Sequence, residues 1–206
     1  MYLVPQGSGW IEVICGSMFS GKTEELIRRL RRARIAQQNV RIFKPAIDRR
    51  YDESDIVSHS DQRIPSRAVT RAEEILDHVP RAVQVVGIDE AQFFEPDLVD
   101  ICRELARRGV RVIVAGLEQD YRAQPFQTMA LLLVEAEYVT KNLAICVVCG
   151  NPAMRNQRIS RKEGRIVVGG ADMYEARCRR CFRPDPVEPG LFGPAEPEAK
   201  DGPPAP

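Results

Sequence analysis

The stretch from Trp10 to Thr23, WIEVICGSMFSGKT, joins a short apolar run to a glycine-rich turn. Residues 10–15 are expected to form a strand, because the run is short, apolar and rich in β-branched side chains. From about Lys22 to Gln37 the pattern is helical, with Leu26, Leu30 and Ala33 on one face. A strand, a turn and a helix in this order predict the first part of a βαβ unit in a parallel sheet.

The turn itself matches the phosphate-binding motif GxxxxGK[ST] at every fixed position. Glycines let backbone N–H groups turn inward around phosphate oxygens, and the N-terminus of the following helix adds positive potential. The Lys22 ammonium would reach the β- and γ-phosphates, and the Thr23 hydroxyl would ligate Mg²⁺. A chance glycine-rich turn would not need this strand–helix context. We therefore expect a nucleoside triphosphate to be bound by Gly16, Ser17, Met18, Phe19, Ser20, Gly21, Lys22 and Thr23.

The chain up to residue 145 continues to alternate short apolar runs with helical segments. Further strands are expected at residues 40–44, 82–88, 110–115 and 138–145, and the second of these is expected to be central because both its faces are hydrophobic. A helix should run from Pro96 to about Arg108, with Gly109 as its C-terminal cap. The polar stretch 45–70 has little periodicity, and a loop of that length is usually functional or mobile. The predicted fold class is α/β, a P-loop NTPase-like parallel β-sheet flanked by helices.

A carboxylate pair follows the strand expected at residues 82–88. Asp89 is placed to hold the metal of a bound nucleotide, although an isolated aspartate there could also be a helix N-cap. Glu90 could polarise a water molecule in an ATPase, or accept the proton of an acceptor hydroxyl in a small-molecule kinase. A protein that only binds nucleotide would not need the second carboxylate.

Four of the six cysteines form two CxxC pairs, Cys146 with Cys149 and Cys178 with Cys181. In a chain without a recognisable export signal these thiols are expected to stay reduced, which favours zinc over disulfides. Four thiolates would leave no open position on the metal, so the zinc should be structural. The site would fix both ends of a long loop from Gly150 to Arg177. Cys15 and Cys102 are expected to be packed apolar side chains.

Composition limits the remaining possibilities. The chain has 206 residues, 44% hydrophobic and 29% charged, with a formal net charge of +1, which fits one soluble domain plus a small appendage. We expect domains at residues 1–145 and 146–183 and a disordered, proline-rich tail at 184–206. No apolar run is long enough to span a membrane, and the expected location is the cytoplasm. Five arginines between Arg28 and Arg34 are interpreted as a solvated face or partner contact rather than a nucleic-acid patch.

Several segments together resemble one known family. The segments GSMFSGKTEELIRR, FKPAIDRRY, SHS, IDEAQFF, GLEQDYRAQPF, VTKNLAIC and VVGGADMYEARC, with the two CxxC pairs, are similar to the zinc-containing (type II) thymidine kinases. The resemblance covers about residues 10–183 in collinear order. It implies transfer of the γ-phosphate of ATP to the 5′-hydroxyl of thymidine, and also of deoxyuridine, by a homotetramer. It also implies a small C-terminal zinc-binding domain whose loop, the lasso, closes over the base.

The resemblance carries roles to particular residues. Glu90 would be the general base and Asp89 would serve Mg²⁺, with Ala91 and Gln92 completing the matching DEAQ motif of the ATP site. Asp48 and Arg50 would lie near the phosphates or metal. The lasso would hold the base through main-chain groups of Arg165, Ile166, Val167, Val168 and Gly169, with Tyr174 closing the pocket. The apolar wall around the nucleoside would comprise Met18, Phe93, Leu117, Tyr121 and Phe126, although Phe93 and Leu117 could equally be core residues. Glu118 replaces the aspartate common in the family, and Tyr121 replaces phenylalanine.

The main alternative is a P-loop ATPase that acts on nucleic acid and grips it with a zinc ribbon. The arginine-rich helix would support this alternative. The balanced net charge and the lack of aromatic residues interleaved with basic ones argue against it. The other alternative is a nucleotide-dependent switch without enzymatic activity. The expected partners are therefore ATP and thymidine, with neither nucleic acid nor a membrane.

Overall fold

The computed structural model describes residues 8–47, 55–57, 63–159 and 173–183. Its main body is a six-stranded sheet in the order β5-β2-β6-β7-β1-β8, in which all neighbouring strands are parallel. The strands are β1 (Trp10–Gly16), β2 (Val40–Pro45), β5 (Arg67–Val69), β6 (Val85–Ile88), β7 (Arg111–Gly116) and β8 (Tyr138–Asn142). This architecture confirms the predicted α/β class.

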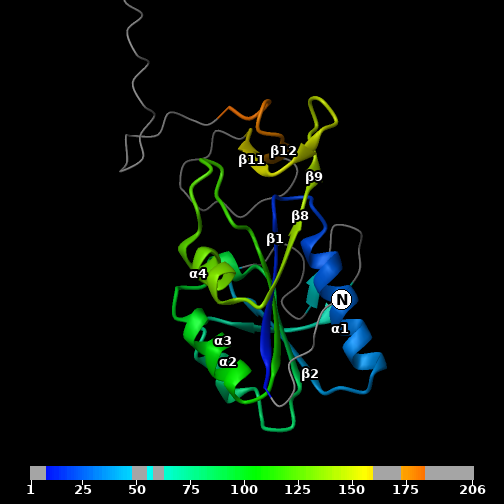
Figure 1. Ribbon diagram of the computed structural model, residues 1–206, viewed down its shortest axis with the longest axis vertical. Coiled ribbons are helices and arrows are strands. Elements are labelled where there is room, and N and C mark those ends of the chain that lie inside the picture. The colour runs from blue at the N-terminus through cyan, green and yellow to red at the C-terminus, as the bar shows by residue number, and fades with distance from the viewer. Residues whose placement is uncertain (1–7, 48–54, 58–62, 160–172, 184–206) are drawn as a thin grey trace, which may run out of the picture.

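Helices cover both faces of the sheet. Figure 1 shows α1 (Lys22–Ile35) on one face and α2 (Glu74–Asp77), α3 (Leu98–Arg107) and α4 (Gln127–Glu135) on the other. On the α1 face, Leu26 and Leu30 pack with Ile42 and Ile113. On the opposite face, Leu98 and Leu105 pack with strand residues such as Val86. Burial on both faces explains why the central strands are almost continuously apolar.

A small C-terminal unit follows the sheet and is called the cysteine unit below. It contains two two-stranded sheets, β9 (Ala144–Ile145) with β10 (Pro152–Ala153) and β11 (Arg155–Arg158) with β12 (Tyr174–Arg177). Its own apolar cluster consists of Ala144, Cys146, Ala153, Ala176 and Cys178. Five small residues make a very small core, so the unit depends on its cysteines and on contacts with the main body.

Several predicted boundaries were wrong. The strand expected at residues 138–145 is divided, because β8 ends at Asn142 and β9 pairs with β10 in the cysteine unit. The strand expected from Ala82 begins at Val85, and the helix expected from Pro96 begins at Leu98. The polar stretch contains β3 (Asp55–Val57), β4 (Arg63–Pro65) and β5, which extends the sheet beside β2. A three-residue edge strand buries too little to create a readable pattern.

Parallel order brings the carboxyl ends of β1, β6 and β7 to one edge of the sheet, next to the cysteine unit (Figure 1). Ligands of open α/β sheets bind at this edge, and it carries the site described next. Across the described residues, no helix has the length and apolar character needed to cross a membrane. The predicted tail at 184–206 lies outside the described residues.

Candidate functional site

The loop of residues 16–23, called the phosphate loop below, connects β1 to α1. Three of its residues have positive φ angles: Gly16 at 148°, Phe19 at 63° and Gly21 at 78°. A Cβ atom on Gly16 would lie 2.3 Å from the Asn142 carbonyl oxygen, so the adjoining strand β8 leaves room only for glycine. The loop is therefore held in a tight, inward-turned conformation that suits anion binding.

Two side chains of the phosphate loop are oriented for an anion. The Lys22 ammonium folds back over the loop and donates to the Ser17 carbonyl oxygen at 2.9 Å. The Ser20 hydroxyl is buried and has no hydrogen-bond partner among the described residues. A buried polar atom without a partner is costly, and a phosphate oxygen would supply the missing one. Phosphate-loop residues line a cleft together with Glu90 and Leu117.

Asp89 lies directly after β6 and faces the phosphate loop. Its carboxylate accepts a 3.1 Å hydrogen bond from the Thr23 hydroxyl, and only 4% of the residue is exposed. Burial, and then the neighbouring Glu90 carboxylate, raise the pKa of Asp89 above its ordinary value. A divalent cation would offset the cost of burying this charge, and a hydroxyl with a carboxylate is a donor set that Mg²⁺ accepts. The two residues predicted as magnesium ligands are thus adjacent and chemically suited to it.

Glu90 has a left-handed backbone conformation, with φ at 51° and ψ at 40°. For a residue other than glycine this conformation costs of order 1 kcal/mol. It begins the turn into η1 (Ala91–Phe93), in which Gln92 is buried. The Gln92 side chain donates to the Glu90 carboxylate, and its oxygen accepts from the Leu117 N–H at 2.9 Å. The candidate general base is therefore held from β7 through Gln92.

The residues predicted for the nucleoside wall divide into two groups. Met18, Tyr121 and Tyr174 form a buried cluster with Met173, called the aromatic cluster below, and Leu117 and Phe19 pack against it. Phe126 is half-buried and packs against the main core on the α3–α4 face, while Phe93 is half-buried in η1. The structure brings three of the five predicted wall residues, Met18, Leu117 and Tyr121, together with Tyr174, which was predicted to close the pocket.

Part of the predicted site cannot be placed. Asp48 and Arg50, and the lasso residues Arg165, Ile166, Val167, Val168 and Gly169, lie outside the described residues. Glu118, whose role the sequence left open, forms a 3.1 Å ion pair with Lys141. Its side chain is about one-tenth exposed, so this pair links the loop after β7 to β8, on the other side of β1.

Two residues of β11 were missed by the sequence analysis. The Arg158 guanidinium lies 3.6 Å from the centre of the Tyr121 ring and donates to the Tyr174 hydroxyl at 3.2 Å. Asn156, only 3% exposed, accepts from the Met18 N–H at 2.7 Å and donates to the Gln119 carbonyl oxygen at 2.9 Å. An isolated Asn or Arg in a polar segment carries no local signal. Only their contacts with the phosphate loop and the aromatic cluster reveal them.

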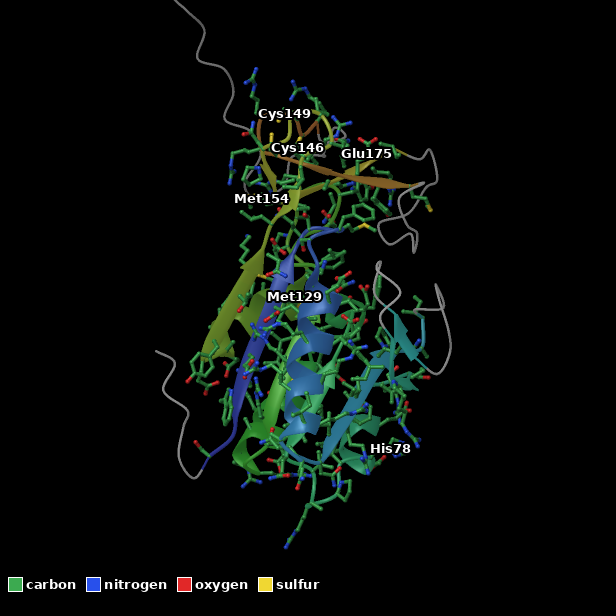
Figure 2. All side chains as sticks on the ribbon, turned by 90° about the vertical axis from the view of Figure 1, so that its right-hand side faces the viewer. His78, Met129, Cys146, Cys149, Met154 and Glu175 are labelled. Carbon is green, nitrogen blue, oxygen red and sulfur yellow. The ribbon has the colours of Figure 1, made fainter. Side chains whose placement is uncertain are left out.

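The four cysteines of the CxxC pairs converge, with their sulfur atoms within 4.8 Å of one another. Sulfur–sulfur distances are 3.6 Å for Cys149 to Cys178 and 3.5 Å for Cys149 to Cys181. These are too long for disulfides, which measure about 2.05 Å. They are close to the roughly 3.8 Å edge of a tetrahedron with zinc–sulfur bonds of about 2.3 Å. Figure 2 shows Cys146 and Cys149 in the cysteine unit, away from the body of the sheet.

Hydrogen bonds favour the thiolate form of two of the four cysteines, Cys146 and Cys149. Burial would raise the pKa of Cys146, but backbone N–H groups of Cys178, Val148 and Cys149 lower it to about 6. The side-chain amide of Asn151 donates to the Cys149 sulfur at 3.3 Å. The hydrogen bond with Cys149, and then burial and the bonds with Cys178 and Cys146, raise the pKa of Cys181 to about 12. The donor set and the separations of this cluster fit a tetrahedral metal ion.

A parallel α/β sheet with this phosphate loop after β1, and with a carboxylate pair after β6 of the same sheet, defines a P-loop nucleotide-binding protein. The family model described as thymidine kinase matches residues 9–182. Thymidine kinase from Rhodothermus sp. (strain ITI 518) is 61% identical over 176 residues, which cover 85% of this chain and 82% of the relative. Thymidine kinase from Bdellovibrio bacteriovorus is 52% identical over 183 residues, 89% of this chain and 90% of the relative. The chain belongs to the thymidine kinase family, as the resemblance of its motifs predicted.

Proposed function

We propose that this protein transfers the γ-phosphoryl group of ATP to the 5′-hydroxyl of thymidine, and also of deoxyuridine. The observation that carries the proposal is the place of Glu90, which lines the cleft of the phosphate loop together with Met18 and Leu117 of the nucleoside wall. A general base that lies between the phosphate loop and an apolar wall suits an acceptor that has both a flat ring and a hydroxyl group. Membership of the thymidine kinase family supports the choice of acceptor.

In the proposed mechanism the phosphate loop binds the triphosphate through its backbone N–H groups and Lys22. Thr23 and Asp89 would hold Mg²⁺, which when bound neutralises charge on the phosphate oxygens. Glu90 accepts the proton of the acceptor hydroxyl while the hydroxyl oxygen forms a bond to the γ-phosphorus. The bond between the γ-phosphorus and the β,γ-bridging oxygen breaks, and ADP leaves. Most of the rate would come from positioning and charge neutralisation. Asp48 and Arg50 would add contacts near the phosphates.

The aromatic cluster and the lasso are proposed to hold the base. A thymine ring offers a flat face and a methyl group, which suit the rings of Tyr121 and Tyr174 and the thioether of Met18. Main-chain groups of residues 165–169 would bind the edge of the ring. Such recognition requires a fixed backbone, and zinc held by the four cysteines would fix both ends of this loop. With four thiolates the zinc would be structural.

Two finer features belong to the same proposal. We propose that the protein is a homotetramer, because the resemblance to the family implies this assembly. We also propose that it lies in the cytoplasm, where the CxxC pairs would stay reduced. Sedimentation of the purified protein checks the assembly, and fractionation of cells that produce it checks the location.

The decisive experiment measures ADP release with MgATP against a panel of nucleosides. Release that depends on thymidine and deoxyuridine, with formation of the 5′-monophosphate, would support the proposal. ATP hydrolysis that is stimulated by DNA and unaffected by thymidine would instead favour the nucleic-acid ATPase. Nucleotide binding without acceptor-dependent ADP would favour a switch.

A further inference from the structure

Strand β11 of the cysteine unit contacts both halves of the site. Side chains two residues apart in a strand point to the same face, and Asn156 and Arg158 have this spacing. Asn156 binds the phosphate loop through the Met18 N–H, and Arg158 contacts Tyr121 and Tyr174 of the aromatic cluster. One short strand therefore supports the nucleotide cradle and the acceptor wall together.

The bridge made by Asn156 is fully buried and joins three segments. Its oxygen accepts from the phosphate loop at 2.7 Å, and its nitrogen donates to the Gln119 carbonyl oxygen in the loop after β7 at 2.9 Å. Two further hydrogen bonds run alongside: Ser17 donates to the Ala153 carbonyl oxygen at 3.3 Å, and Gln119 donates to the Met154 carbonyl oxygen at 2.9 Å. The phosphate loop cannot move without breaking or carrying these contacts.

The same strand leads to the cysteine cluster. Asn156 pairs in register with Ala176 of β12, and Ala176 packs with Cys146 and Cys178 in the apolar cluster of the unit. Phe19 of the phosphate loop packs against that cluster and against the aromatic cluster. Contacts are thus continuous from the phosphate loop, through Asn156 and β12, to the cysteines.

We propose that Asn156 is a positioning residue that couples the phosphate loop to β11, so that nucleotide binding orders the strand that supports the acceptor wall. The acceptor part of this inference rests on the proposed function, and the coupling of loop to strand does not. Coupling between two sites is reciprocal, so an ordered acceptor wall also strengthens nucleotide binding.

The test is hydrogen exchange of the complete protein with and without Mg²⁺ and the non-hydrolysable analogue β,γ-imido-ATP. In the wild type, nucleotide should slow exchange both in the phosphate loop and in residues 155–158, the latter by about fivefold or more, the lower end of typical coupling between sites. In Asn156→Ala the phosphate loop should stay protected, and the effect on residues 155–158 should fall below about twofold.

Gln157→Ala is the matched control. Gln157 lies next to Asn156 on β11, but its side chain bonds Arg158 and Arg183 within the cysteine unit. In Gln157→Ala, nucleotide should slow hydrogen exchange at residues 155–158 as much as it does in the wild type. If this control lost the effect of nucleotide on residues 155–158 to the same extent as Asn156→Ala, the proposal would be overturned.

A kinetic measurement separates positioning from mere support. In Asn156→Ala, kcat for thymidine should fall about tenfold more than in Gln157→Ala, and thymidine should no longer strengthen binding of the ATP analogue as it does in the wild type. Equal kcat values in the two variants would also overturn the proposal. If Asn156→Ala does not fold, the wild type decides: nucleotide that leaves exchange at residues 155–158 unchanged refutes the coupling. The wild type could bind nucleotide and show slowed exchange at residues 155–158 but phosphorylate no nucleoside. That result would contradict the proposed function and leave the coupling intact.

Discussion

Gln92 holds Glu90 in place. The side-chain nitrogen of Gln92 donates to the Glu90 carboxylate, while its oxygen accepts from the Leu117 N–H at 2.9 Å. Gln92 is only 4% exposed, so the bridge is shielded from water and its geometry is well defined. It links the turn after β6 to the end of β7, the two strands that flank the cleft. A general base fixed in this way is oriented before its substrate arrives.

Gln92→Ala should therefore lower kcat by about 10- to 100-fold, because small displacements of a reacting group have effects of this size. The KM for ATP should change little, since Lys22 and the phosphate loop are untouched. Unfolding in urea should show a loss of about 1–3 kcal/mol, the cost of leaving the Leu117 N–H without its partner. Gln127→Ala, an exposed position on α4, is the control. An unchanged kcat in Gln92→Ala would show that the bridge has no role in positioning.

Glu90→Ala should reduce turnover by about 10²–10⁴-fold, the usual contribution of a general base. Affinity for an ATP analogue, measured by calorimetry, should stay close to that of the wild type. Glu95→Ala, at an exposed position five residues away, should be fully active. Retained activity in Glu90→Ala would refute the assignment of the base.

The backbone of Glu90 provides a separate prediction. Its φ of 51° is unfavourable for any residue with a Cβ atom. Glu90→Gly should therefore be about 1 kcal/mol more stable than Glu90→Ala, although both should be inactive. Equal midpoints in urea unfolding would argue that this turn stores no strain.

Removing the cysteine cluster should affect the acceptor before the nucleotide. In Cys149→Ser, or after treatment with a strong chelator, thymidine affinity should fall at least about tenfold, because β11 and β12 lose their support. Affinity for the ATP analogue should fall less. Val148→Ala lies in the same turn, is 57% exposed and should behave as the wild type. A metal-free protein with full thymidine affinity would contradict the argument that the cluster fixes the lasso.

Glu12 provides a prediction about stability and pH. This buried residue of β1 accepts hydrogen bonds from Arg111 at 2.6 Å and from Arg29 at 2.7 Å. Burial alone would raise the pKa of Glu12, but the bonds from Arg111, Trp10 and Arg29 outweigh it and lower the pKa below 4.5. Glu12→Gln should therefore cost about 3 kcal/mol near neutral pH, because the largely buried Arg111 guanidinium loses its counter-charge and Arg29 keeps only its ion pair with Glu25.

The sign of the pH dependence follows from the lowered pKa. A carboxylate with a depressed pKa in the folded state contributes fully above its unfolded value of about 4.5 and loses that contribution as pH falls through the folded value. The gap in unfolding free energy between wild type and Glu12→Gln should be constant from about pH 6 to 8 and shrink below about pH 4. Glu95→Gln, at an exposed position before α3, should change stability little at any pH. A gap that widened in acid would contradict the assigned charge state.

Local patterns in the sequence were sufficient to predict those parts of the site that each consist of one short continuous segment. The phosphate loop, the carboxylates after β6 and the two CxxC pairs each combine fixed spacing with a chemical requirement, so they could be recognised without coordinates. The α/β class followed from the alternation of apolar runs with helices. Strand ends and short edge strands such as β5 were missed, because three residues bury too little surface to impose a period on the sequence.

Tertiary structure alone decided which distant residues meet. Asn156 bonds Met18 across 138 positions, and Arg158 of β11 stacks on Tyr121 in the loop between β7 and α4. Gln92 could be named from its motif, but its role as a bridge depends on β6 and β7 lying side by side. Chain order fixes hydrogen bonds only between near neighbours. The buried polar contacts between the phosphate loop, the general base Glu90 and the cysteine unit arise from tertiary packing. No local sequence pattern predicts such packing.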